Sequence, residues 1–266
     1  MKKYKMKKYI IAAVMLALYS CVFCAQSTMP PVTEPEGRTF TVVIDPAHGG
    51  GEWGVYVKGV HEKDINLKVA LLLKKKLDST PQGAVTALLT RDKDTYMSVT
   101  DRAAAANAAS ADLYITIHCD YTEASSAEGF RVYYNLPSVE RPARAGMELW
   151  ETAHNASHHD SVRLASVITQ YMSAALLPEN MTAAGSEEND LLPFSARPQE
   201  GVRSHTLKGV SAPACEIVLG NLYSRSDFEN LKDQQVLDRI AYHIKEGILN
   251  FLKTDARDGE KNVKTQ

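Results

Sequence analysis

Residues 41–51 read TVVIDPAHGGG, and this stretch decides the fold and points to the functional site. Four β-prone residues lead into an Asp-Pro pair, and the run ends at His48 and three glycines. A buried strand of this kind places its last polar residue at the carboxyl end of the strand, where open α/β sheets bind their ligands. A single histidine is more often structural than a ligand, so His48 needs partners. Glu62 and His118 are the two candidates.

Strands and helices alternate along the rest of the chain. Hydrophobic periodicity predicts further strands at residues 85–90, 112–118, 128–134 and 214–219. It predicts amphipathic helices at residues 65–76, 101–109, 161–176 and 236–252. This alternation predicts α/β architecture: a single domain with a mostly parallel twisted sheet and helices on both faces.

The chain divides into four predicted segments. The first 25 residues have the basic start and short apolar core of a signal peptide, too short to span a bilayer comfortably. Its end, LYSC, resembles a lipobox that would place a lipid on Cys21, and cleavage near Ala25 without a lipid is an equal alternative. Either route exports the protein to the periplasm or cell envelope. The segments are a signal peptide at 1–25, a linker at 26–38, the folded domain at 39–253 and a polar tail at 254–266.

Charge and cysteine content exclude several classes of protein. The 266 residues hold 30 Lys and Arg against 32 Asp and Glu, and this balance argues against nucleic acid as a partner. After export only Cys119 and Cys215 would remain, too few for a disulfide-built scaffold. Each neighbours a candidate site residue but points to the opposite face of its strand. We therefore expect two buried core thiols and no cysteine ligand.

A second predicted strand, DLYITIH at residues 112–118, also ends in a histidine, His118. Glu62 precedes a helix, where the helix dipole alone would favour a carboxylate. Two strands that end in histidine, with an acid between them, give the two-histidine, one-carboxylate composition of catalytic zinc sites. A second histidine group is a weaker metal candidate, because neighbouring helical residues point in different directions; it comprises His154, His158 and His159.

Glu216 is the one acid in the apolar run ACEIVL at residues 214–219. A charge buried there without a partner would be costly. A metal site or a catalytic role would explain it, and a structural salt bridge is the alternative. A long irregular stretch, residues 178–213, precedes this strand, and loops of this length are usually functional or disordered. Its part at residues 178–205 is expected to border the substrate groove.

Residues 39–251 resemble the zinc-dependent N-acetylmuramoyl-L-alanine amidases of the amidase-3 type. The motifs that carry the resemblance are IDPAHGG, HEKDINLKVA, LLTRDKD, DRAAAAN, ITIHCD, EGFRVYY and LKGVSAPACEIVLGNL. The resemblance implies that His48, Glu62 and His118 are zinc ligands. It implies cleavage of the amide between N-acetylmuramic acid and the first L-alanine of the stem peptide. Peptidoglycan, glycan and stem peptide together, is the implied partner, and a protein activator could act on the enzyme.

The implied mechanism is metal-assisted hydrolysis, with Glu216 as the acid–base group. The family pattern puts its glutamate five residues after a proline, at the position held here by Val218. Glu216 is two residues early, which keeps it on the same face of the strand but roughly 6.5 Å away. Two acids after His118 are alternative acid–base groups, Asp120 and Glu123.

Two rival functions remain open. The chain could keep zinc but act as a catalytically impaired peptidoglycan-binding or regulatory protein, which the displaced glutamate would explain. It could also be a zinc hydrolase that acts on a different amide or peptide bond. Acids of the long loop could instead reach the zinc and block it, although solvated charge is the simpler explanation; they are Glu187, Glu188 and Asp190.

Overall fold

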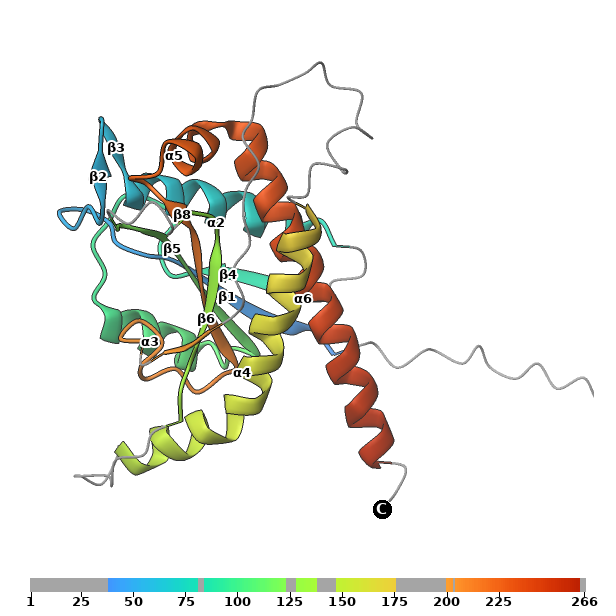
Figure 1. Ribbon diagram of the computed structural model, residues 1–266. Helices are drawn as coiled ribbons and strands as arrows, with labels where there is room; N and C mark the ends of the chain where they lie inside the picture. Colours follow the sequence, from blue (N-terminus) through green and yellow to red (C-terminus); the bar gives the residue numbers. More distant parts are fainter. Residues whose placement is uncertain are drawn as a thin grey trace, which may run out of the picture. The chain divides into compact units, whose positions relative to one another are not determined.

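The computed structural model describes residues 38–80, 84–122, 128–137, 147–175, 200–202 and 204–263, with the backbone alone at 147–155, 174–175, 200 and 255–263 (Figure 1). The chain separates into two units, Met1–Arg38 and Thr39–Gln266. The fold and the site below belong to the second unit. The expected signal peptide and nearly all of the expected linker lie outside the described residues.

A six-stranded sheet forms the centre of the second unit, in the strand order β4-β1-β5-β8-β6-β7. The strands β4, β1, β5 and β8 are mutually parallel, whereas β6 pairs antiparallel with β8 and parallel with β7. The predicted mostly parallel sheet is therefore confirmed. The strand bounds are β1 Phe40–Pro46, β4 Val85–Leu89, β5 Leu113–Asp120, β6 Arg131–Asn135, β7 Glu200–Val202 and β8 Ala214–Asn221.

Helices cover both faces of the sheet, as predicted. Alternate side chains of each strand point to opposite faces, so Val42 and Ile44 enter a large core with α2, α4 and α6, and Val43 enters a smaller core with α3. Figure 1 shows α4 and α6 side by side along the sheet. The helix bounds are α2 Glu62–Asp78, α3 Val99–Ala108, α4 Met147–Ala175, α5 Arg225–Lys232 and α6 Gln234–Val263. Among the described residues, every helix is too short or too polar to span a bilayer.

Several elements differ from the sequence-based expectation. The helix expected at 161–176 begins earlier, at Met147, and the last helix runs to Val263, into the expected polar tail. The short helix α5 was not predicted; the Ser224 hydroxyl accepts from Asp227 N at its start. Two short strands, β2 (Tyr56–Val57) and β3 (Val60–His61), form an antiparallel hairpin. Such short elements carry too few residues for a periodic pattern to reveal them.

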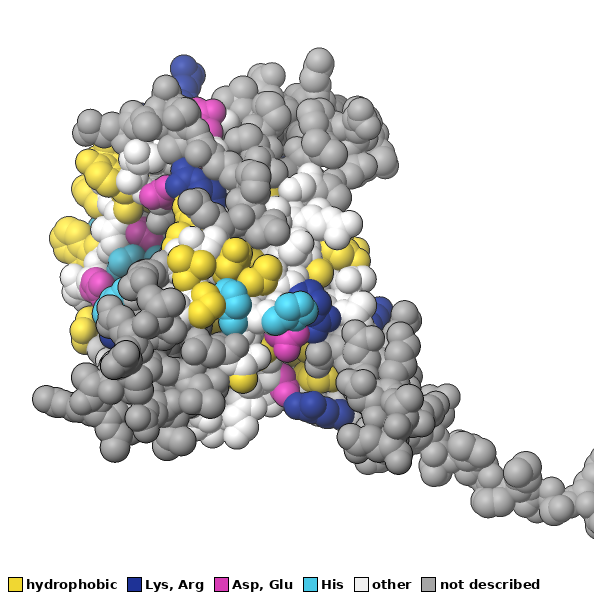
Figure 2. All heavy atoms as spheres, turned by 60° about the horizontal axis from the view of Figure 1, so that its bottom comes forward, with side chains coloured by type: hydrophobic (Ala, Val, Ile, Leu, Met, Phe, Trp, Pro, Cys, Tyr) yellow, Lys and Arg dark blue, Asp and Glu magenta, His cyan; other side chains and the backbone are white. Residues whose placement is uncertain are grey.

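The hairpin stands out from the sheet beside the start of α2 (Figure 1). Along the same side of the molecule, in the view of Figure 2, hydrophobic side chains lie beside histidine and acidic side chains. The carboxyl ends of β1 and β5, where the candidate site residues meet, lie on the hairpin side of the sheet in Figure 1.

Candidate metal centre

His48 lies in the loop after β1 in a backbone conformation that side chains rarely adopt. Its φ is 63°, in the left-handed region. The carbonyl of His48 accepts a hydrogen bond from Arg102 Nη2 at 2.7 Å, and Ala47 N donates to Ile117 O of β5 at 3.1 Å. These contacts fix the loop against the neighbouring strand and turn the imidazole toward the start of α2.

Glu62 begins α2 and is 2% exposed. Its carboxylate accepts hydrogen bonds from Val55 N at 2.9 Å, Cys119 N at 2.9 Å and Asn66 Nδ2 at 3.3 Å. These donors come from the segment before the helix, from β5 and from α2 itself. The carboxylate is therefore built into the rim of the sheet, and a favourable helix dipole alone does not account for its position.

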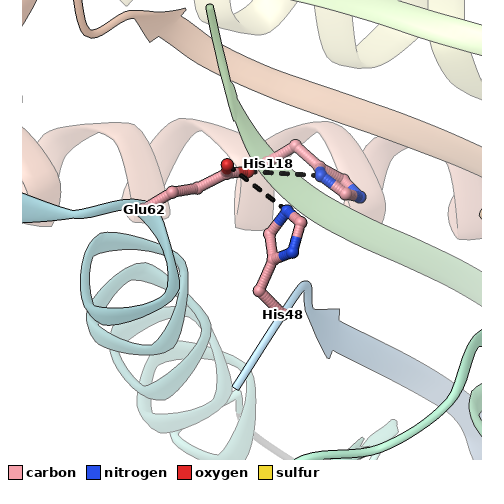
Figure 3. A group of neighbouring side chains, drawn as sticks. All are labelled: His48, Glu62 and His118. Carbon is pink, nitrogen blue, oxygen red and sulfur yellow. Dashed lines mark ion pairs between the residues drawn. The ribbon is translucent and has the colours of Figure 1, made fainter. Parts of the chain in front are cut away.

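The two histidines bracket this carboxylate. His48 Nε2 lies 3.3 Å from Glu62 Oε2, and His118 Nδ1 lies 3.3 Å from Glu62 Oε1. The imidazole planes are nearly perpendicular, with centroids 5.4 Å apart. Figure 3 shows both rings converging on the carboxylate, from the loop after β1 and from β5. The structure thus brings together all three residues predicted to bind metal, with one ligand atom from each within 4.8 Å of the others.

The donor set fits a small divalent cation. Ligand atoms of tetrahedral zinc, at bond lengths near 2.0–2.1 Å, lie about 3.3 Å apart. Each nitrogen–oxygen separation here has that size, although the two histidines face different oxygens of the carboxylate. The ring nitrogens that face Glu62 are His48 Nε2 and His118 Nδ1, and these would be the ligand atoms. The opposite nitrogens, His48 Nδ1 and His118 Nε2, are buried and make no hydrogen bond among the described residues. Glu52 Oε1 lies 3.3 Å from His48 Nδ1, where a carboxylate could orient a metal-bound histidine. The cluster is compatible with a metal site, and its composition alone does not identify the metal.

Electrostatics keep Glu62 ionised in this buried place. Burial raises the pKa of Glu62, but hydrogen bonds and charges from His118 and His48 outweigh it and hold that pKa well below its usual value. Burial lowers the pKa of His118, while Glu62 and the charge of Glu216 raise it, with a net upward shift. A buried carboxylate needs a compensating cation, and a metal ion would supply it without protonating the histidines.

Glu216 lies on β8, one strand away from His118. The register pairs Thr116 with Glu216 and His118 with Val218, so Glu216 shares the face of His118 but lies two residues further from the rim. Ser204 Oγ and Thr206 Oγ1 donate to Glu216 Oε2 at 2.7 and 2.6 Å. Among the described residues no ion pair involves Glu216, so hydroxyl groups and not the alternative salt bridge hold its carboxylate there.

The other sequence candidates lie apart from the cluster or outside the described residues. Asp120 forms an ion pair with Arg131. His158 Nδ1 lies 3.1 Å from Asn135 O, and the side chain of His159 is 91% exposed. The expected burial of both thiols is confirmed, and burial raises the pKa of Cys119 and of Cys215. The candidates without a described side chain are Glu123, His154, Glu187, Glu188 and Asp190.

Sequence reasoning missed two buried arginines that hold the His48 loop. Arg102 pairs with Asp45 at 2.6 Å, and its guanidinium also donates to Pro46 O at 2.8 Å. Arg91 donates to Pro46 O at 2.9 Å and to Ala47 O at 3.0 Å. Both lie in motifs quoted above, LLTRDKD and DRAAAAN. Charged residues are usually exposed to solvent, so the motifs did not indicate that these two side chains are buried.

The comparison with protein families decides the assignment. A family model described as N-acetylmuramoyl-L-alanine amidase matches residues 42–250. The chain belongs to this amidase family. The match spans the fold from β1 to α6, including the His48 loop, Glu62, His118 and the strand that carries Glu216.

Individual amidases resemble parts of the chain. N-acetylmuramoyl-L-alanine amidase CwlM from Bacillus licheniformis is 31% identical over 169 residues, 62% of this chain and 65% of that protein. LytC from Bacillus subtilis strain 168 is 37% identical over 95 residues, 36% of this chain and 18% of LytC. The matched segments therefore span less than two thirds of the length of these relatives.

Solved amidase structures share the fold. The amidase from Clostridium difficile 630 superposes with a TM-score of 0.64 at 25% identity, covering 81% of this chain and 97% of that one. AmiC2 of Nostoc punctiforme gives a TM-score of 0.62 at 23% identity, covering 82% and 99%. Both likenesses support the α/β architecture described above.

Proposed function

We propose that the chain is a zinc-dependent amidase that hydrolyses the amide between N-acetylmuramic acid and L-alanine in peptidoglycan. The observation that carries the proposal is the buried carboxylate of Glu62 held 3.3 Å from a nitrogen of each histidine. Family membership supplies the substrate class, and the cluster supplies a place for the metal.

In this proposal His48, Glu62 and His118 would hold zinc, which supplies Lewis acidity and lowers the pKa of water at the site. Glu216 accepts a proton from the attacking water as that water adds to the amide carbon. The same carboxyl then protonates the leaving nitrogen of L-alanine, so that the amide C–N bond breaks. The side-chain face that Glu216 shares with His118 supports this role.

The hydrogen bonds from the hydroxyl groups of Ser204 and Thr206 would orient the carboxylate of Glu216 for proton transfer. Both donate to Oε2, and Oε1 has no hydrogen bond among the described residues. A carboxylate anchored through one oxygen keeps the other available for a proton. Ser204 and Thr206 would therefore orient the acid–base group.

A second candidate function is peptidoglycan binding or regulation with zinc bound and little turnover. The register between β5 and β8 supports this second function, because His118 is paired with Val218 and not with Glu216. If the carboxylate cannot reach the water from two residues further back, the zinc site would remain but hydrolysis would be slow.

Location and protein partners belong to the same proposal. Action on peptidoglycan implies export to the periplasm or cell envelope, with the first 25 residues as signal peptide and with or without a lipid on Cys21. A protein activator is a further proposed partner. One solved structure of similar fold, CwlD from Clostridioides difficile, is in complex with the GerS lipoprotein, a partner that belongs to CwlD.

Digestion of purified peptidoglycan tests the function. The zinc-loaded protein should release stem peptides with a new amine terminus on L-alanine, detected by amine labelling and mass spectrometry. A new terminus on another residue would favour a hydrolase of a different bond. Binding to peptidoglycan without any new terminus, with zinc bound, would favour the regulatory function.

A further inference from the structure

Three aromatic rings gather at the β2–β3 hairpin beside the metal centre, Trp53 from the loop before it and two from its strands. Trp53 and Tyr56 are 52% and 53% exposed. The ring of His61 stacks on Tyr56 with centroids 4.7 Å apart and meets Trp53 edge-on at 5.1 Å. Trp53 and Tyr56 are themselves 6.3 Å apart. We refer to Trp53, Tyr56 and His61 as the hairpin platform.

The platform is joined directly to the metal centre. Gly54, the residue after Trp53, packs so closely against the site that an added Cβ would lie 2.7 Å from Cδ2 of His48. The next residue, Val55, donates its N–H to Glu62 Oε2. A substrate whose scissile bond lies at the metal centre would therefore have its flanking groups within reach of the platform. Figures 1 and 2 place the hairpin and exposed hydrophobic side chains on the same side of the molecule.

The charges around the platform favour a neutral ligand. Glu52 and Asp64 flank it, with side chains 52% and 51% exposed. These acids disfavour an anionic group at the platform, and a neutral sugar ring meets no such repulsion. Lys58, the basic residue of the hairpin turn, lies over the ring of Phe228 at 5.4 Å and contributes to packing there. Exposed Trp and Tyr offer apolar faces with polar edges, which suit a ligand that is apolar on one face and hydroxylated around its rim.

We infer that the hairpin platform binds a sugar ring of the glycan next to the scissile amide, through contact of the C–H face of the ring with Trp53 and Tyr56. This inference rests on the proposed function, since it takes the glycan to be part of the substrate. It goes further by assigning the glycan side of the substrate to the hairpin and not to the long loop at 178–205.

Tryptophan fluorescence tests the inference without requiring turnover. The chain has two tryptophans, so Trp150→Phe leaves Trp53 as the reporter. The zinc-loaded variant is titrated with a β-1,4-linked tetramer of N-acetylglucosamine, and separately with a free stem tripeptide that begins with L-alanine. A saturable change in Trp53 emission with the sugar and none with the peptide is expected. A change with the peptide alone, or with neither probe, overturns the inference.

Variants at Tyr56 locate the binding. In the Trp150→Phe background, Tyr56→Ala should weaken sugar binding roughly 2- to 10-fold, the effect of one lost aromatic contact. Tyr56→Phe keeps the ring and should bind like the parent. The matched control is Tyr242→Ala, which removes an exposed tyrosine from α6. Equal affinities for the sugar in all three variants would contradict the inference. The zinc content of Tyr56→Ala checks that this variant has kept its fold.

Peptidoglycan digestion separates this inference from the proposed function. If the chain is an amidase with the platform as described, Tyr56→Ala should raise KM for glycan-containing substrate and leave kcat nearly unchanged. Hydrolysis by the wild type together with unchanged KM in Tyr56→Ala would overturn the platform and leave the amidase standing. Sugar binding at Trp53 in a protein that never hydrolyses peptidoglycan would overturn the amidase and leave the platform standing.

Discussion

At the scale of single residues, the site depends on one buried carboxylate. The Glu62 carboxylate accepts hydrogen bonds from two backbone N–H groups and faces two imidazoles. Protein groups, and not solvent, therefore stabilise its charge. The sequence predicts Glu62 at the start of a helix, where a favourable interaction of its carboxylate with the helix dipole is the simpler hypothesis. The hydrogen bonds from Val55 and Cys119 could not be predicted, because both donors depend on how the hairpin and β5 pack around the helix.

Glu62→Gln should weaken zinc binding by more than the loss of a helix-dipole contact, which is worth only about 0.3–1 kcal/mol. The change removes the negative charge that favours a cation but keeps the shape of the side chain. Competition against a chelator of known affinity measures the effect. Asp64→Asn is the matched control, because Asp64 is an exposed acid in the same first turn of α2 and should leave zinc affinity nearly unchanged.

Glu216→Gln should retain zinc and stability but lose hydrolysis by roughly 10²- to 10⁴-fold, as expected when an acid–base group is removed. Initial rates on purified peptidoglycan, with zinc content measured in parallel, provide the comparison. Glu229→Gln, an exposed acid on α5, should behave like the wild type. Near wild-type turnover in Glu216→Gln would mean that this carboxylate is structural and that another acid does the chemistry.

At the scale of elements, the parallel pairing of β1 with β5 brings the two histidines together. The register aligns Asp45 with Thr116 and Pro46 with Ile117, so β1 ends beside Ile117 and the loop that carries His48 lies next to His118. The sequence predicted this meeting, because it placed both histidines at the carboxyl ends of parallel strands; in the structure β5 continues past His118 to Asp120. The β2–β3 hairpin was not predicted, because its strands have two residues each. Its position nevertheless shapes the site through Gly54 and Val55.

Two glycines of this hairpin region allow a matched test of that shaping. Gly54 and Gly59 both have positive φ, 63° and 86°, so alanine at either position costs similar backbone strain, about 1–2 kcal/mol. Only at Gly54 would the new Cβ overlap Glu62 Oε2 and press on His48. Gly54→Ala should therefore lose zinc binding, while Gly59→Ala should keep it with slightly lower thermal stability. Equal zinc content in both variants would show that the hairpin does not shape the site.

At the scale of the whole molecule, the alternation of strands and helices predicted the sheet and the helices on both of its faces. The two strands that end in histidine, with an acid between them, predicted the metal cluster, and the amidase-3 resemblance added zinc and the substrate. The role of Glu216 could not be predicted from the sequence. A shift of two residues along a strand keeps the side chain on the same face but changes which atoms it can reach. The role of the long loop also stays a prediction. Deletion of residues 184–190 should alter peptidoglycan turnover, and unchanged turnover would make the loop a simple connection.

We propose that the fold assembles His48, Glu62 and His118 into one zinc site. Metal analysis of His118→Ala after zinc loading and removal of free metal tests this claim most directly. We expect one zinc per chain in the wild type and almost none in the variant, because the loss of one of three protein ligands leaves too few to hold the ion. Full zinc occupancy in His118→Ala would contradict the account.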